Sequence, residues 1–376
     1  MKLPPVLLAC AFVGSLSGLL DARAESELVP LRRLAIGELG GWVELTLTIG
    51  DRAGRWLLDT GASRNLVSPH LARQLGLSPS GSVRADTLLG QVQGGEIELP
   101  PLHVGAFKHS GQRALVIAPQ ELLGVAAEGI DGVLGVPWLD GVQAELDLRA
   151  WTATFRAGGM ADCPDGLAAV VLARYRTLPV IAIATGTDRE RYVLDTGNPG
   201  GLIRVEADAP GATTPGLAIP GNMRLTVLRE AALGPHKRTD VPVTRLTSAP
   251  LKRALGDAAK GLAGTAFMDG ARWQLDLARD RLCVEPGSFA TPGGFGLVPV
   301  RQGEDLRVQF VLPGSPAAQA GLRVGDTIVR WADLPASRPL AELWQALQGR
   351  EEIGLAVGEP ARKLTLKRSI FAPAAP

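Results

Sequence analysis

The sequence predicts a mainly β protein, in which two copies of one β unit are followed by a smaller third unit. A five-residue phrase carries the first prediction, because it occurs as Leu-Leu-Asp-Thr-Gly at residues 57–61 and as Val-Leu-Asp-Thr-Gly at residues 193–197. Short alternating runs separated by Gly and Pro indicate β-strands joined by turns. A Pro/Gly/Ser/Thr-rich segment at residues 286–294 then precedes a different motif.

The repeat is longer than the phrase itself. Each copy is followed, in the same order, by a Gly-centred apolar segment and by the tripeptide Leu-Asp-Leu. These segments occupy residues 132–138 and 146–148 after the first copy, and residues 261–267 and 275–277 after the second. The interval from Gly135 to Asp147 equals that from Gly264 to Asp276. A lone Asp-Thr-Gly would be a weak signal, but three ordered anchors that occur twice indicate a duplicated domain.

Length and composition are those of an ordinary globular protein. The 376 residues suffice for two or three domains with sizeable cores. The net charge is +1 and 20% of residues are charged, so no basic excess points to a nucleic-acid partner. Gly (46) and Pro (28) are plentiful and aromatic residues make up 5%, as expected of many turns between short strands.

The N-terminus predicts a secretory signal peptide at residues 1–24. Lys2 supplies the positive start, residues 6–20 supply the apolar region, and Ala22-Arg23-Ala24 supplies a small-x-small cleavage site. Residues 25–376 would then lie in the periplasm, in the cell envelope or outside the cell, with no integral membrane span. An alternative is lipidation at Cys10, because Leu-Leu-Ala-Cys at residues 7–10 is similar to a lipoprotein box.

The predicted elements follow the repeat. In the first unit the alternation predicts strands at residues 42–49 and 55–58, a helix at 69–77 ended by Gly76, a Gly-punctuated hairpin at 88–95 and a closing strand at 151–155. In the second unit we expect strands at residues 179–184 and 191–194 and a closing hairpin over 273–285, whereas residues 206–255 have no clear register.

The third unit has two helix signals. Ser315 and Pro316 begin a short helix that Gly321 ends, since a hydroxyl caps the helix and Pro suits its first position. Apolar residues at 0, +3, +4 and +7 predict an amphipathic helix over residues 340–347. The predicted organisation is a signal peptide at 1–24, β lobes at 25–160 and 161–287, a linker at 288–291, the third unit at 292–369 and a tail at 370–376.

Over residues 30–287 the duplicated pattern resembles the retropepsin/pepsin-type aspartic peptidases, particularly their bacterial secreted relatives. The stretch Gly-Ser-Pro-Ala-Ala-Gln-Ala-Gly-Leu-Arg-Val-Gly-Asp at residues 314–326 resembles a bacterial PDZ domain, over residues 292–369. The resemblance implies two homologous retropepsin-like lobes paired by pseudo-twofold symmetry, followed by a PDZ domain, a small β barrel with two helices. It also implies an aspartic-type endopeptidase of the cell envelope.

Asp59 and Asp195 are the candidate catalytic residues. Two carboxylates in van der Waals reach share one proton, and the pair can activate a water for peptide hydrolysis without a covalent intermediate, a metal or another cofactor. The resemblance implies that each Thr of the repeated phrase bonds to the opposite lobe and that the glycines keep the backbone close to the carboxylates. The expected supporting residues are Thr60, Gly61, Thr196, Gly197, Gly135 and Gly264.

Two departures from the family keep an alternative open. Asn198 stands where the family usually has Ser, Thr or Ala, and no tyrosine lies in the expected flap. The candidate flap residues are Leu88, Leu89, Gly90, Gln91 and Val92. The alternative function is a catalytically inert, protease-like protein of the envelope that binds peptides.

The expected partners are polypeptide substrates, with C-terminal peptides at the PDZ groove. Such a groove adds a peptide strand to its sheet edge and holds the terminal carboxylate with loop N–H groups, for which the candidate loop is Gly294, Phe295, Gly296 and Leu297. We expect a monomer, the alternative being that each lobe pairs with its counterpart in another chain. Cys163 and Cys283 form either a disulfide that bridges the two lobes or two independent thiols, and four scattered histidines do not indicate a metal site.

Overall fold

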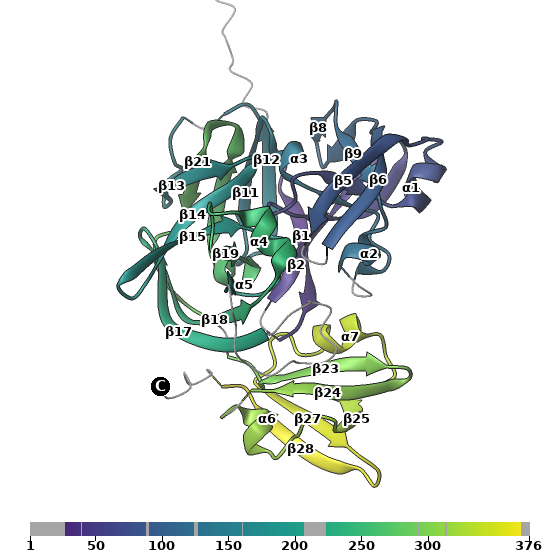
Figure 1. Ribbon diagram of the computed structural model, residues 1–376, viewed down its shortest axis with the longest axis vertical. Coiled ribbons are helices and arrows are strands. Elements are labelled where there is room, and N and C mark those ends of the chain that lie inside the picture. The colour runs from purple at the N-terminus through teal and green to yellow at the C-terminus, as the bar shows by residue number, and fades with distance from the viewer. Residues whose placement is uncertain are drawn as a thin grey trace, which may run out of the picture.

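The computed structural model describes residues 27–38, 40–87, 90–123, 127–159, 161–206, 223–291, 293–312 and 314–369. The fold is mainly β, as the sequence predicts, and its helices are short. Two β units lie side by side, and a C-terminal unit lies against one end of them (Figure 1). The predicted signal peptide, Cys10 and the tail from residue 370 lie outside the described residues.

The first β unit begins with a hairpin that leads directly to Asp59. Gly50, at φ +62°, connects the two strands in their antiparallel register, from Ile49 opposite Arg52 to Val43 opposite Leu58. The elements of this unit are β1 (Val29–Ile36), β2 (Gly40–Ile49), β3 (Arg52–Leu58), β4 (Asn65–Val67), α1 (Pro69–Gln74), β5 (Ser80–Thr87), β6 (Gly90–Glu98), β7 (Leu102–Val104), β8 (Phe107–His109), β9 (Arg113–Val116), α2 (Pro119–Leu123), β10 (Gly132–Leu134), α3 (Val136–Leu139), β11 (Val142–Asp147) and β12 (Thr152–Ala157).

The second β unit repeats this topology. β3 pairs in parallel with β10, with Leu57 opposite Val133, and β15 pairs in parallel with β19, with Val193 opposite Leu262. The unit consists of β13 (Ala168–Tyr175), β14 (Leu178–Thr185), β15 (Asp188–Leu194), β16 (Leu202–Val205), β17 (Met223–Leu233), β18 (His236–Leu246), α4 (Ala249–Leu255), β19 (Gly261–Ala263), α5 (Thr265–Met268), β20 (Arg272–Asp276), the 3₁₀ turn η2 (Leu277–Arg279), β21 (Arg281–Val284) and β22 (Gly287–Ala290).

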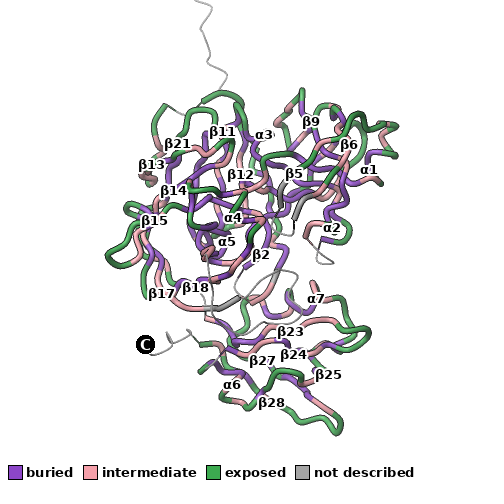
Figure 2. Tube along the Cα trace, in the orientation of Figure 1, coloured by how far each residue is buried: buried purple, intermediate pink, exposed green. Residues whose placement is uncertain are grey.

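A continuous sheet crosses from one β unit to the other, in the strand order β1–β12–β11–β20–β21–β13. Its centre is the pairing of β11 with β20, in which Ala144 lies opposite Leu275. The strands that lead into the two Leu-Asp-Leu segments of the sequence repeat therefore pair in this sheet. Buried residues run through the interior of both units (Figure 2), and Trp56, Trp138 and Trp273 are fully buried among them.

The structure departs from the expected boundaries in two places. The expected linker at residues 288–291 falls on β22, which pairs in parallel with β18, so most of this segment belongs to the second β unit. Residues 206–255, for which the sequence gives no register, contain the long hairpin of β17 and β18 and then α4. The partner of β22 is β18, an earlier strand remote in sequence, and local patterns do not report such a pairing.

The C-terminal unit has its own sheet and its own core. Its elements are β23 (Leu297–Gln302), β24 (Asp305–Val311), α6 (Pro316–Gln319), β25 (Thr327–Trp331), β26 (Leu334–Pro335), α7 (Leu340–Gln345), β27 (Glu352–Val357) and β28 (Arg362–Lys367). The sheet runs in the order β23–β24–β25–β27–β28, with β26 beside β25. Ser315 caps α6 by accepting the N–H of Ala318, as predicted. Trp331 donates its ring N–H to the Leu343 carbonyl at 2.7 Å and fixes α7 on the sheet.

None of the helices in the described part of the chain combines the length and the apolar character needed to cross a bilayer.

Candidate active site

Two equivalent turns present Asp59 and Asp195. Each turn follows the central strand of its unit, β3 or β15, and is held by the downstream strand of the same unit. The Asp59 N–H donates to the Leu134 carbonyl at 2.9 Å, and the Asp195 N–H donates to the Ala263 carbonyl at 2.8 Å. The parallel pairs β3–β10 and β15–β19 thus fix the points at which the two carboxylates leave the strands.

The two carboxylates lie together, each against the glycine of the opposite turn. The Gly61 N–H donates to Asp59 Oδ1 and the Gly197 N–H to Asp195 Oδ1, both at 2.9 Å. A Cβ atom on Gly61 would lie 2.3 Å from Asp195 Oδ1, and one on Gly197 would lie 2.4 Å from Asp59 Oδ2. Only glycine leaves this space, because real Cβ atoms do not approach an oxygen so closely.

Thr60 and Thr196 join the two turns by four buried hydrogen bonds. Thr60 Oγ1 donates to the Leu194 carbonyl and Thr196 Oγ1 to the Leu58 carbonyl, each at 2.6 Å. Each hydroxyl also accepts the backbone N–H of the other threonine at 3.0 Å. Both threonines are fully buried, so every one of these polar groups depends on its partner in the other unit.

Gly135 and Gly264 pack directly beneath the turns. A Cβ on Gly135 would lie 2.6 Å from the Ala62 carbonyl oxygen, and one on Gly264 would lie 2.3 Å from the Asn198 carbonyl oxygen. In the first unit, the Gly135 N–H donates to Asn65 Oδ1 at 2.9 Å. These glycines therefore occupy the positions that the sequence repeat assigns to them.

Asn198 holds its own turn and leaves the carboxylate of Asp195 in the same geometry as that of Asp59. Its Oδ1 accepts the Gly200 N–H at 3.0 Å, and its backbone carbonyl accepts the Thr265 N–H at 2.8 Å. The departure from the family pattern at this position thus changes how the turn is buttressed, while the glycine N–H still binds Asp195.

Burial and proximity shift the titration of both carboxyl groups. Burial raises the pKa of Asp59, while the hydrogen bonds from Asp195 and from backbone N–H groups oppose that rise. Burial raises the pKa of Asp195 much further, because the nearby charge of Asp59 and the hydrogen bond that Asp195 donates add to it. The two groups therefore share one proton and titrate as a pair.

A cavity of about 150 Å³ lies over the two carboxylates. It is lined mainly by apolar side chains of the first unit, together with Arg64, which pairs with Glu96 at 3.4 Å. The apolar lining residues are Ala62, Leu66, Val92, Leu122, Leu123 and Val133. The cavity therefore offers an apolar surface beside the two acids, with one cation at its edge.

The β5–β6 hairpin borders this cavity. Val92 of β6 lines it, and the backbones of both strands lie close to α4 of the second unit. Of the candidate flap, Gly90 and Gln91 belong to β6, whereas Leu88 and Leu89, the expected tip, lie outside the described residues.

The remaining candidate residues lie elsewhere. Cys163 and Cys283 form a disulfide that ties the segment before β13 to β21 of the second unit, so it does not join the two units across the carboxylates. Gly294, Phe295, Gly296 and Leu297 lie at the start of β23, where three of their N–H groups bind the carboxylate of Glu38.

Sequence reasoning missed two residues that reach across the units. Trp42 of β2 donates its ring N–H to the Gly197 carbonyl at 2.8 Å and so supports the Asp195 turn from the first unit. Glu38 binds a loop that begins more than 250 residues later. An isolated Glu in a Gly-rich turn and a Trp in a strand gave no local signal for either contact.

Comparison with known proteins agrees with this geometry. Residues 45–138, which contain Asp59, Gly135 and the walls of the cavity, match the family described as aspartyl protease. The match covers less than half of the chain, and it supports an aspartyl protease family and a hydrolase of that general kind. No curated protein matches the chain.

Proposed function

We propose that this protein is an aspartic-type endopeptidase in which Asp59 and Asp195 activate a water between two homologous lobes related by a pseudo-twofold axis. The hydrogen-bond exchange between Thr60 and Thr196 carries this proposal, since it sets one carboxylate from each lobe side by side. The lobes are both present in one chain, so the enzyme works as a monomer and needs no second copy.

In the reaction, ionised Asp59 takes a proton from the water while the water oxygen bonds to the scissile carbonyl carbon. Asp195 donates its proton to the carbonyl oxygen, which gives a neutral tetrahedral intermediate. The proton that Asp59 acquired then passes to the amide nitrogen as the C–N bond breaks, and Asp195 recovers its proton as the carboxyl product forms. The pair ends with one proton, as it began, and no covalent enzyme intermediate forms.

The cavity walls define the substrate. Apolar side chains around the carboxylates favour an apolar side chain next to the scissile bond of an extended polypeptide. The β5–β6 hairpin closes over that peptide as a flap, with Val92 facing the cavity. Because it approaches α4, the flap spans the cleft from the first lobe to the second.

The C-terminal unit supplies recognition. We assign it as a PDZ domain, on the basis of the motif at residues 314–326, the N-cap at Ser315 and the N–H-rich loop before β23. It recruits polypeptides with free C-termini. The signal sequence at residues 1–24 directs the enzyme to the periplasm or the cell exterior, where a disulfide between Cys163 and Cys283 is stable.

A cleavage assay in heavy-oxygen water tests the proposed activity. Residues 25–376 would be incubated with a diverse peptide library in H₂¹⁸O from acid to neutral pH, and the products identified by mass spectrometry. We expect cleavage beside apolar residues, with ¹⁸O in the carboxyl group of each new C-terminus. Failure of the folded protein to cleave any peptide at any pH would refute the activity and favour the inert peptide-binding alternative.

A further inference from the structure

The loop that precedes β23 already holds a carboxylate from another part of the chain. The side chain of Glu38, in the turn between β1 and β2, accepts the N–H groups of Phe295 at 2.7 Å, Gly296 at 2.9 Å and Leu297 at 3.0 Å. Both carboxylate oxygens are used, because Phe295 and Gly296 bind Oε2 and Leu297 binds Oε1. Three converging N–H groups are the arrangement that captures a terminal carboxylate.

The loop is shaped for this purpose by residues of the C-terminal unit. Gly296 has φ +81°, and a Cβ on it would lie 2.1 Å from Ser315 Cβ, so glycine alone fits there. Arg368 lies over the ring of Phe295, 5.0 Å from its centroid, and adds a positive charge that acts on Glu38. The groups that bind an anion here therefore belong to the C-terminal unit, and the anion that they hold is the Glu38 carboxylate of the first β unit.

The segment before Glu38 enters the C-terminal unit as well. Ala35 of β1 is buried in that unit's apolar core, and β1 lies against α7. The end of β1 and the turn that follows thus dock on the C-terminal unit much as a peptide ligand would, with Glu38 in place of a terminal carboxylate.

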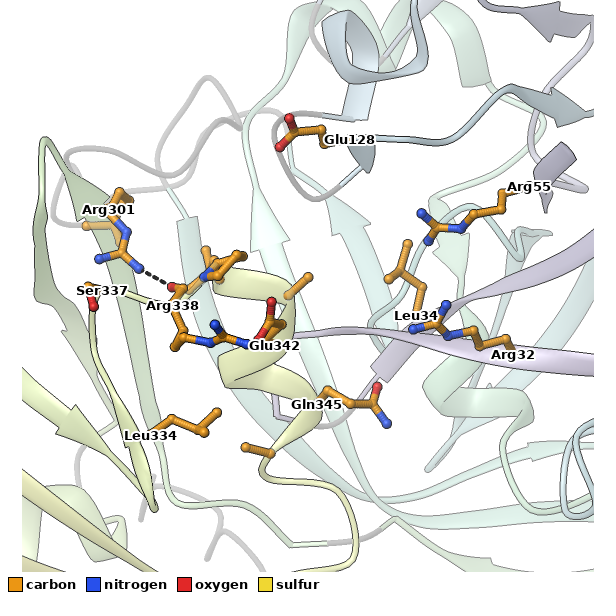
Figure 3. Close-up of a pocket in the computed structure, with 15 residues that line it drawn as sticks. Arg32, Leu34, Arg55, Glu128, Arg301, Leu334, Ser337, Arg338, Glu342 and Gln345 are labelled. Atoms are coloured by element: carbon orange, nitrogen blue, oxygen red, sulfur yellow. Dashed lines mark hydrogen bonds and ion pairs between the residues drawn. The ribbon is translucent and has the colours of Figure 1, made fainter.

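A groove beside this docked turn remains open. Its volume is about 1120 Å³, and it is lined by Arg301 of β23 and by α7 of the C-terminal unit, with Arg32 and Leu34 of β1 on the side of α7 away from Arg301 (Figure 3). Among the described strands, β23 pairs with β24 and with no other, so its outer edge has unpaired backbone groups. Such an edge can accept an extended peptide as an added strand.

We propose that Glu38 is a built-in ligand of the loop at residues 294–297, and that a peptide laid along β23 binds through its C-terminal carboxylate only by replacing Glu38. This inference rests on the peptide-recognition part of the proposed function. Since the loop offers one set of three N–H groups, the two carboxylates exclude each other. The apparent association constant for the peptide is the intrinsic constant multiplied by the fraction of molecules in which Glu38 is released.

The residues that follow this turn contact the Asp195 loop. A Cβ on Gly40 would lie 1.4 Å from the Pro199 carbonyl oxygen, and the Gly41 carbonyl accepts the hydroxyl of Thr265 at 2.7 Å. Trp42, one residue further, binds the Gly197 carbonyl. Release of Glu38 therefore acts on a segment whose other end is fixed on the second carboxylate turn.

Binding of matched peptides tests the competition. A fluorescent decapeptide library ending in Ala, Val or Leu would be prepared twice, with free C-terminal carboxylates and with C-terminal carboxamides. Both sets would be titrated into residues 25–376 carrying Asp59→Asn, so that cleavage does not enter the measurement. We expect Glu38→Gln to tighten binding of the free-acid peptides on the order of tenfold or more, and to leave the carboxamide peptides unchanged. The matched control is Glu359→Gln, which removes an exposed carboxylate in the turn between β27 and β28, outside the groove, and should change neither.

Hydrogen exchange provides a second test, because it measures the protection of the loop amides even when no peptide is present. The amides of Phe295, Gly296 and Leu297 should exchange slowly in the parent protein and faster after Glu38→Gln, and the free-acid peptides should slow them again. Unchanged exchange in the variant would show that Glu38 does not occupy the loop and would overturn the proposal.

The binding outcomes separate this proposal from the function on which it rests. If the free-acid peptides bind the parent and Glu38→Gln equally well, competition is refuted while peptide recognition by the C-terminal unit stands. If they bind neither protein, peptide recognition itself fails, and the proposal fails with it. Neither result bears on cleavage by Asp59 and Asp195, which the heavy-oxygen assay measures separately.

Discussion

Thr60 and Thr196 each accept the other's backbone N–H at 3.0 Å, and each donates its hydroxyl to a carbonyl of the opposite β unit. The exchange is symmetric, and both residues are fully buried. These hydrogen bonds join the two Asp turns, and the positions of the turns determine where the two carboxylates lie.

Thr60→Val should therefore destabilise the protein. Valine keeps the shape but leaves the Thr196 N–H and the Leu194 carbonyl without their partner, at a cost of about 1–3 kcal/mol in the free energy of unfolding. Thr60→Ser keeps the hydroxyl and should lose less. The matched control is Thr46→Val, at an exposed position of β2. Urea denaturation measures all three, and a Thr60→Val protein as stable as the parent would contradict the account.

Gly61→Ala should abolish cleavage. The new Cβ would lie 2.3 Å from Asp195 Oδ1, so the two carboxylates would have to separate. As a control, Gly354→Ala adds the same atom at an exposed strand position with no neighbour within 4 Å and no positive φ. Rates of peptide cleavage compare the two variants, and normal turnover by Gly61→Ala would show that the carboxylates do not depend on this close packing.

Stability should fall as pH rises, whereas activity should pass through a maximum. The pKa values of Asp59 and Asp195 are raised above the ordinary value of 3.8, so the folded protein holds protons that the unfolded chain releases. That contribution to stability is complete below pH 3.8 and is lost as pH rises through the raised pKa values. Cleavage needs one ionised and one protonated carboxyl group, so its rate should rise as the first group of the pair ionises and fall as the second loses the shared proton.

Rate profiles and urea titrations across pH check this expectation. Asp195→Asn should flatten the dependence of stability on pH, whereas Asp51→Asn, at an exposed turn, should leave it as in the parent. A stability that increases steadily from acid to neutral pH in the parent, and is unaltered by Asp195→Asn, would be inconsistent with raised pKa values in this pair.

Reduction of the disulfide should weaken the second β unit. Cys163 and Cys283 are 120 residues apart in sequence, and a crosslink that closes so long a loop contributes roughly 2–4 kcal/mol. Cys163→Ala should lower the free energy of unfolding by that amount, and dithiothreitol should lower the parent to the same value without affecting the variant. Equal stability of the oxidised and reduced parent would argue against a role for the bond.

The repeat in the sequence predicts the two Asp turns well because their requirements are local. Gly61 and Gly197 are needed where the backbone approaches a carboxylate closely, and Gly135 and Gly264 where it approaches another backbone segment. Such requirements appear in the sequence as repeated glycines at fixed spacing. The Ser315 cap and α7 can likewise be predicted from the sequence, since capping and helical periodicity depend on neighbouring residues.

Contacts between segments that are distant in the chain could not be predicted from the sequence. The expected linker became β22 because β18 offers it a parallel partner, and no pattern within residues 288–291 reports that edge. Glu38 and Trp42 act on loops of other units, and their roles depend on how the units pack. Asn198 suggested a weakened site from its type alone, whereas its side chain bonds within its own turn.

Single and double substitution of the two acids tests the central claim most directly. Peptide cleavage would be measured for Asp59→Asn, Asp195→Asn and the double variant, with folding followed by circular dichroism. Because the pair works as one unit, each single change should abolish turnover as completely as the double change while the fold is retained. Substantial cleavage by either folded single variant would contradict a shared proton and a water activated between Asp59 and Asp195.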